Sequence, residues 1–194
     1  MATNIQDQNI GTFYEIARTR DFARKFQFRV VQLGVSGILP EDLIYAETAA
    51  LPGRQINNIP VPYMGLSFNV PGVAAYPGSA SYKITFRCDK DYHLRSKLER
   101  DMFRTFDDAT SSGEYSIPGA DSVLSLVLTN KKNVAIRQYN LYGVYLQSID
   151  DEQYDIKDTG NVVSINTTIA YQYWKVVVPA LGFQQTTPRD SSGR

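Results

Sequence analysis

The sequence predicts a mainly β fold, an antiparallel β-barrel or sandwich of long strands with one flanking α-helix. Residues 162–178 alternate aliphatic or aromatic side chains with small polar ones, and a period of two is typical of a half-buried strand. This segment is much longer than the usual strand of about six residues, so it needs long partner strands. Several other segments alternate in the same way, whereas residues 91–106 give the one convincing helical pattern.

The expected elements follow from these two periods and from the positions of proline and glycine. In chain order they are an amphipathic helix or turn from residue 12, strands at 26–31 and 43–50, a hairpin at 54–71, a strand at 81–88, the helix at 91–106, a strand at 123–129, a long strand or a pair at 134–149, an acidic loop at 150–158 and the closing strand at 162–178. We expect one β-barrel domain over residues 21–178, with a partly mobile segment at 1–20 that contains a short helix and a flexible tail at 179–194.

Proline explains why residues 54–71 should form an edge-like hairpin. Pro60, Pro62 and Pro71 cannot donate to a strand ladder, so this segment is expected to be extended and to turn near Met64-Gly65. The helix at 91–106 is supported by an i, i+4, i+8 stripe of Leu94, Leu98 and Met102.

Composition excludes several classes of function. The chain has 194 residues, 43% of them hydrophobic, and its 20 Lys and Arg balance 20 Asp and Glu. Zero net charge argues against tight sequestering of DNA or RNA, and it does little to prevent self-association. The single Cys88 excludes an internal disulfide framework and suits a reducing compartment. Residues 1–11 are polar and no apolar run reaches membrane-helix length, so we expect synthesis in the cytosol and no stable membrane association.

No catalytic, cofactor-binding or metal-binding constellation can be assembled from the sequence. His93 is the only histidine, so a histidine metal site or a triad lacks a second member. The acidic run at 150–158 lacks the spacing and central glycine of a calcium loop and reads as a solvated loop. The chain has 13 tyrosines, which could form a stacking platform for sugar or single-stranded nucleic acid. Without basic residues beside them, core and subunit-interface roles are the better interpretation, and we expect no enzyme.

Long strands and a single helix leave sheet edges open. An open edge can pair with other chains and cause aggregation unless it is paired or covered. Assembly of copies that continue the sheet is one remedy. A head-to-tail interface that closes gives a ring, and a second such contact can stack rings into a filament. These considerations favour a structural subunit over an enzyme.

Four stretches in order resemble the tail tube proteins of contractile-tailed bacteriophages, a family similar to the tubes of type VI secretion and related injection machines. They are DFARKFQFRVVQLG at 21–34, ALPGRQINNIPVPYMGLSFNVPG at 50–72, the strand and helix at 81–106, and LYGVYLQSIDDEQYDIKDTGNVVSINTTIAYQYW at 141–174. The family usually has Trp-Pro near the position of Tyr142-Gly143, which this chain lacks. The loops at 73–81 and 107–121 and the tail at 179–194 are further departures.

The resemblance implies a structural virion protein of the phage tail. Six copies would form a ring whose inner strands join into one continuous β-barrel, and stacked rings would form a hollow tube inside a contractile sheath. The tube would conduct the genome into the host, so DNA would pass through it transiently. The implied partners are further copies of the chain, the tail sheath protein, the tape-measure protein and baseplate or neck proteins, with assembly in the host bacterial cytoplasm.

We place the expected contacts on two groups of residues. Candidates for the interface between subunits are Ile56, Ile59, Val61, Tyr63, Phe68, Ile169, Tyr171 and Tyr173. Candidates for contact between rings are Arg18, Arg20, Arg24, Asp150, Asp151 and Glu152. Two alternatives remain open: a ring protein that initiates or terminates the tube, at the baseplate or neck, and a monomeric ligand-binding β module that uses its tyrosines.

Overall fold

The computed structural model describes residues 9–114 and 116–177. Its elements are α1 (Ile10–Arg20), β1 (Phe28–Leu33), the 3-10 helix η2 (Asp42–Tyr45), β2 (Ala46–Ala49), β3 (Gln55–Tyr63), β4 (Leu66–Ala75), β5 (Tyr82–Arg87), α2 (His93–Thr105), β6 (Val123–Thr129), β7 (Ala135–Tyr142), β8 (Tyr145–Ile149), β9 (Ser164–Ala170) and β10 (Tyr173–Val177). The predicted tail at 179–194 lies outside the described residues, as does most of the polar stretch at the amino terminus.

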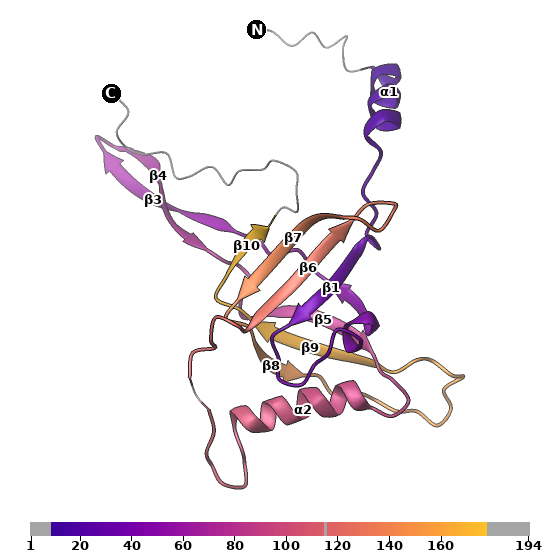
Figure 1. The fold of residues 1–194 in the computed structure, drawn as a ribbon. Coiled ribbons are helices and arrows are strands. Elements are labelled where there is room, and N and C mark those ends of the chain that lie inside the picture. The colour runs from indigo at the N-terminus through magenta and orange to yellow at the C-terminus, as the bar shows by residue number, and fades with distance from the viewer. Residues whose placement is uncertain (1–8, 115, 178–194) are drawn as a thin grey trace.

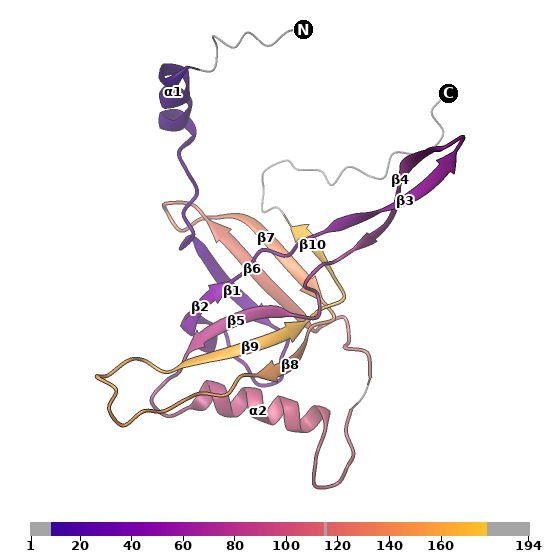
Figure 2. The same ribbon diagram turned by 180° about the vertical axis from the view of Figure 1, so that it is seen from behind.

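Two four-stranded antiparallel sheets form the body of the molecule (Figures 1 and 2). One sheet has the strand order β1-β6-β7-β10 and the other β2-β5-β9-β8, while β3 and β4 pair only with each other. The prediction of a mainly antiparallel β fold is confirmed. The sheets do not close into a barrel within one chain, because β1 and β10 end one sheet and β2 and β8 end the other.

The core lies between the two sheets and follows from strand alternation. In β5 the side chains of Ile84 and Phe86 are fully buried, while the intervening Thr85 and the flanking Arg87 point away from the core. Phe86 is opposite Ile165 of β9, and Leu124 of β6 is opposite Leu141 of β7. Burial of each such aliphatic or aromatic side chain contributes about 1.5–3 kcal/mol.

The prediction of one uninterrupted strand at 162–178 is wrong. The strand ends at Ala170, and after Tyr171 and Gln172 the chain continues as β10 in the other sheet. The neighbouring segment at 134–149 divides at the same place into β7 and β8, the pair that the sequence left open. Both segments therefore pass from one sheet to the other at the same corner of the molecule. There the Gln172 amide donates a 2.9 Å hydrogen bond to the Tyr142 carbonyl.

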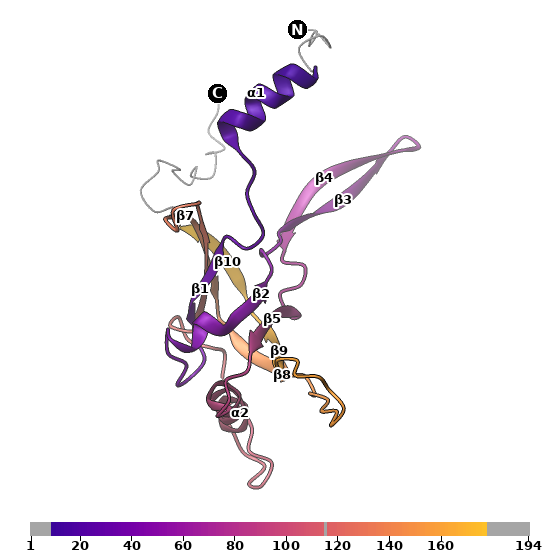
Figure 3. The same ribbon diagram turned by 90° about the vertical axis from the view of Figure 1, so that its right-hand side faces the viewer.

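The main helix is confirmed as α2, and its buried stripe places it on the body. Leu94 and Leu98 are buried, and the Asp89 carboxylate accepts a 3.2 Å hydrogen bond from the His93 amide at the helix start. A second helix, α1, forms where the sequence allowed a helix or a turn, capped by the Asn9 side chain. Figure 3 shows α1 standing away from the sheets, and none of its residues is buried.

The expected strand at 43–50 is only partly present. Its first residues form η2, and the strand is limited to Ala46–Ala49. Asp42 explains the tight turn, because its Oδ2 accepts hydrogen bonds from the Leu39 amide at 2.8 Å and from Lys97 Nζ at 2.6 Å. These bonds fix the start of η2 and bury Leu43 in the core.

Candidate assembly surfaces

The β3–β4 hairpin projects from the body (Figure 3). Met64 and Gly65 both have positive φ, 47° and 80°, as a two-residue type I′ turn requires. The hairpin predicted at 54–71 with its turn at these residues is therefore confirmed, and it extends to Ala75. Directly opposed residues share a face of the hairpin. The opposed pairs Ile59–Val70, Val61–Phe68 and Tyr63–Leu66 form what we call the apolar face.

No described residue covers the apolar face. Its six side chains keep between 44 and 65% of their surface exposed. The opposite face of the hairpin is made of other residues, among them the opposed pairs Pro60–Asn69 and Pro62–Ser67. A contiguous exposed apolar stripe of this kind is typical of interaction sites. A lone two-stranded hairpin is also marginally stable in water.

The sequence identified most of this face. Ile59, Val61, Tyr63 and Phe68, which the sequence suggests for the subunit interface, all belong to the apolar face. Ile56, the fifth candidate in β3, is also exposed. Leu66 and Val70 were missed, although their alternation with Ser67 and Asn69 could have revealed them. A bulge in β4 lies opposite Asn57, and its backbone requires glycine at position 72, because a Cβ there would lie 2.8 Å from Ile59 Cγ1.

The other three expected interface residues lie in different places. Ile169 is fully buried and Tyr171 is 3% exposed, both in the core between the sheets. Their side chains are therefore not available to a neighbouring copy, which corrects their expected role. Tyr173 is 40% exposed on the edge strand β10, where its ring stacks on Tyr142 with 5.0 Å between centroids.

The residues expected at the contact between rings do not meet within one chain. Arg18 and Arg20 end α1, and Arg24 lies in the linker before β1. Asp150, Asp151 and Glu152 begin the loop after β8, at the opposite end of the body (Figure 1). None of these three carboxylates forms an ion pair within the described part of the chain.

Arg20 and Arg24 line one cavity of about 620 Å³. Their neighbours there come from the linker and from the turn between β6 and β7. Between these two segments, Lys131 forms an ion pair with Asp21. The hydrogen bond from Lys131 and the one from the Phe22 amide hold the pKa of Asp21 below its ordinary value.

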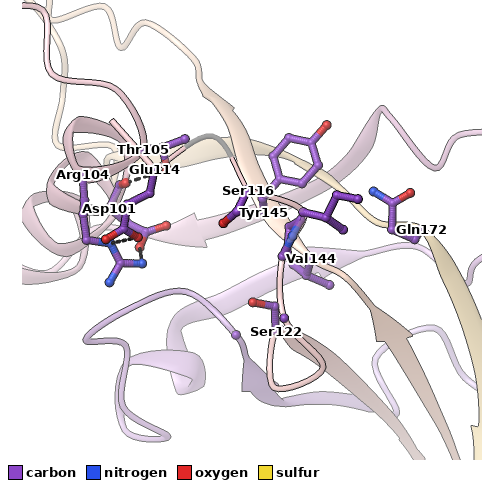
Figure 4. Close-up of a pocket in the computed structure, with 13 residues that line it drawn as sticks. Asp101, Arg104, Thr105, Glu114, Ser116, Ser122, Val144, Tyr145 and Gln172 are labelled. Atoms are coloured by element: carbon purple, nitrogen blue, oxygen red, sulfur yellow. Dashed lines mark hydrogen bonds and ion pairs between the residues drawn. The ribbon is translucent and has the colours of Figure 1, made fainter. Parts of the chain in front are cut away.

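A second cavity, of about 470 Å³, lies between the end of α2 and the corner of the sheets (Figure 4). Its buried carboxylate belongs to Asp101, which accepts hydrogen bonds from the Ser36 amide at 3.2 Å and from Arg104 at 3.1 Å. Arg104 also lies 4.0 Å from Glu114. Arg104 thus lies between the carboxylate of Asp101 in α2 and that of Glu114 in the following loop, and these three groups do not include a nucleophile with an adjacent base.

Across residues 9–114 and 116–177, no cluster of three or more His, Cys, Asp or Glu side chains has a metal-binding arrangement. No helix in the same ranges is long and apolar enough to cross a membrane.

Comparison with solved structures identifies the type of fold. The chain is similar to the tube-terminating cap of the anti-feeding prophage, with a TM-score of 0.57 and 12% identity over 92% of this chain and 100% of the cap chain. It is similar to a chain of the sheath–tube complex of the extracellular contractile injection system PVC in its extended state, with a TM-score of 0.54 and 14% identity over 85% of this chain and 97% of that one. A chain of the six-fold symmetrised anti-feeding prophage baseplate gives a TM-score of 0.50 and 10% identity, over 67% of this chain and 78% of that one.

No protein-family model and no curated protein sequence matches the chain. The structural neighbours are tube, cap and baseplate components of contractile injection systems, so the fold is tail-tube-like. At 10 to 14% identity the likeness establishes a shared fold.

Proposed function

We propose that this chain is a subunit of the tube of a contractile phage tail or a related injection machine. It acts by assembly: copies join into hexameric rings, the rings stack into a hollow tube, and the tube lies inside a contractile sheath. The structural neighbours, which come from a sheath–tube complex, a tube-terminating cap and a six-fold symmetrised baseplate, support this proposal. They also favour a non-enzymatic role, because all are structural components.

The observation that carries the proposal is the uncovered apolar face of the β3–β4 hairpin. Six apolar side chains line one side of a hairpin that pairs with no other described strand. A second copy that covers this face would remove apolar surface from water, which contributes about 25 cal/mol for each Å². The open edges at β1, β2, β8 and β10 offer further places where a neighbour can continue a sheet.

The proposed partners follow from this role. They are further copies of the chain, a sheath protein, a tape-measure protein and baseplate or neck proteins, within a virion or a similar particle assembled in bacterial cytoplasm. DNA is the proposed passenger if the particle is a phage. Zero formal net charge suits a conduit, because each phosphate contact would add salt-dependent affinity and slow the passage.

A terminal ring is the second candidate, favoured by the match to the tube-terminating cap over the whole length of that cap chain. A ring of this kind would form from the same hairpin contacts without continuing to stack. A monomeric ligand-binding module is less well supported. Tyr82, Tyr139 and Tyr171 are buried in the core and cannot serve as an exposed stacking platform.

The test is a pair of variants followed by sedimentation velocity over a concentration series. Ile59→Ser with Phe68→Ser removes apolar side chains from the hairpin, and Ile117→Ser, at a side chain that is 84% exposed in the loop before β6, is the control. The proposal predicts that wild type and control associate and that the hairpin variant stays monomeric with unchanged circular dichroism. If the hairpin variant associates as well as the wild type does, the proposal is contradicted.

A further inference from the structure

The cavity at the linker before β1 is lined by exposed cations, which we call its rim, and by apolar side chains. Its charged lining residues are Arg20, Arg24, Lys131, Lys132 and Arg137, with Asp21 as the single carboxylate. Its apolar lining includes Phe22, Leu128 and Ile136. Among the described residues, only Lys131 of these five cations forms an ion pair, with Asp21. We call this cavity the cationic pocket.

The cationic pocket also contains an unsatisfied polar group. Thr129 lines it, and its Oγ1 is buried without a hydrogen-bond partner in the described structure. Thr129 as a whole is only 7% exposed. Because Thr129 Oγ1 is itself inaccessible, the feature of the pocket that a partner can meet is its charge: four of its five cations form no ion pair with a described residue.

The loop between β8 and β9 has the complementary character. It carries Asp150, Asp151, Glu152, Asp155 and Asp158 against the single cation Lys157. None of these six charged groups takes part in an ion pair with a described residue. Two apolar side chains project from the same loop, Ile156 fully exposed and Tyr154 65% exposed.

The shape of the acidic loop is held by its own hydrogen bonds. Asp158 Oδ1 accepts from the amides of Gly160 and Asn161 at 2.8 and 2.9 Å, and Asp155 Oδ1 accepts from the Lys157 amide at 2.9 Å. The Tyr154 hydroxyl also donates to the Tyr92 hydroxyl over 3.3 Å, which ties the loop to the turn before α2. A partner that binds this loop thus orders little new chain, which lowers the entropic cost of binding.

The cationic pocket and the acidic loop lie at opposite ends of the molecule. In Figures 1 and 2 the β6–β7 turn is at the end of the body from which the linker to α1 leaves, and the loop between β8 and β9 projects at the other end. One chain therefore cannot bring the two together. Two chains placed head to tail can, and a head-to-tail contact that does not close repeats without limit.

We infer that the cationic pocket receives the acidic loop of a second copy of this chain, as the contact that joins consecutive rings. This inference rests on the proposed function for its setting and goes beyond it by naming the two surfaces. The carboxylates of the loop meet the rim cations Arg20, Arg24 and Lys132. The fully exposed Ile156 enters among the apolar lining residues.

A charge-swap experiment on the full-length protein tests this pairing. Arg24→Glu with Lys132→Glu reverses the rim, and Asp151→Arg with Glu152→Arg reverses the loop. At about 0.15 M salt, each pair raises the concentration needed for half-maximal assembly about tenfold or more, because close interfacial charge pairs contribute more than 1.4 kcal/mol. The four substitutions together restore assembly to within a few-fold of wild type.

The control variant is Lys83→Glu with Arg100→Glu. It changes the net charge as much as the rim variant does, at exposed positions outside the pocket, and leaves assembly unchanged.

Sedimentation and electron microscopy of the same samples separate the two claims. If both charge-reversed variants still stack into tubes as wild type does, or if the combined variant assembles no better than either pair, the loop-and-pocket contact is overturned and the proposed function stands. Charge-dependent head-to-tail oligomers that never form rings support the contact and overturn the proposed function. A wild type that never associates, alone or with its baseplate, overturns both.

Discussion

The indole Nε1 of Trp174 donates a 2.9 Å hydrogen bond to the carbonyl oxygen of Gly53, two residues before β3 begins. The Trp174 ring also lies against Tyr139, with 5.7 Å between centroids. This bond joins the edge strand β10 to the base of the projecting hairpin. The bond therefore holds the hairpin, which is the surface proposed for assembly, against the body of the molecule.

Replacement of Trp174 with Phe should loosen the hairpin without unfolding the body. The variant keeps an aromatic ring and loses the hydrogen bond, which contributes about 1 kcal/mol. We expect a small drop in melting temperature, faster hydrogen exchange over residues 54–75 and weaker assembly. Tyr173→Phe, at the neighbouring position, removes a hydroxyl for which no hydrogen bond is seen and serves as the control. Equal exchange in the two variants would show that the bond does not hold the hairpin.

Gly143 should tolerate no side chain at the corner where the chain changes sheets. It has a φ of 66°, and a Cβ would lie 2.6 Å from Gln172 Cγ. Gly143→Ala therefore combines a conformational cost of about 1–2 kcal/mol with a steric cost. Gly37→Ala, at a φ of 79° with no atom within 4 Å, carries the conformational cost alone. Chemical denaturation should show a larger loss of stability at Gly143 than at Gly37, and similar losses would contradict the close approach.

Ile169 and Ile59 should behave in opposite ways, because one is in the core and the other on the apolar face. Ile169 is fully buried opposite Tyr82, so Ile169→Ala should lower the free energy of unfolding by about 2–5 kcal/mol. Ile59 is 52% exposed, so Ile59→Ala should leave the unfolding of the single chain nearly unchanged and weaken assembly. Urea titration of the monomer and sedimentation of each variant make this distinction. Strong destabilisation of the monomer by Ile59→Ala would argue that the hairpin is part of the core.

Asp42 should make the fold sensitive to acid. Partial burial raises its pKa, but hydrogen bonds from Lys97 and the Leu39 amide outweigh burial, and the pKa is lowered from its ordinary value of 3.8. A lowered folded-state pKa gives stability that is present above about pH 4 and is lost as the pH falls through the folded value. Asp42→Asn should be less stable than wild type by about 2 kcal/mol at pH 7, with the difference shrinking below pH 4. The exposed Asp108→Asn is the control, and a difference at Asp42 that stays constant from pH 7 to pH 2 would exclude this linkage.

The sequence predicts best those elements in which the hydrophobic period agrees with the positions of proline and glycine. Helical spacing gives α2, strand alternation gives β5 and β6, and proline with Met64-Gly65 gives the hairpin and most of its apolar face. Each of these features depends on local chemistry, which a single sequence contains.

Residues 163–173 show a feature of the fold that the hydrophobic pattern of a sequence cannot reveal. Alternation continues through Tyr171, yet the chain passes there from one sheet to the other. A strand that changes sheets keeps apolar residues at alternate positions, so periodicity cannot reveal the crossing. The same limit explains why Ile169 was expected at an interface, since an apolar face buried within one chain looks the same as one buried between chains. The cationic pocket was hidden for a related reason, because its cations come from segments about 110 residues apart.

Negative-stain electron microscopy of the purified wild-type protein over a concentration series tests the central claim most directly. The account predicts six-membered rings, and stacked rings or hollow tubes as the concentration rises. Rings that never stack would favour the terminal-ring candidate. Small uniform particles at every concentration, with or without added baseplate, would contradict the claim that this chain builds a tube.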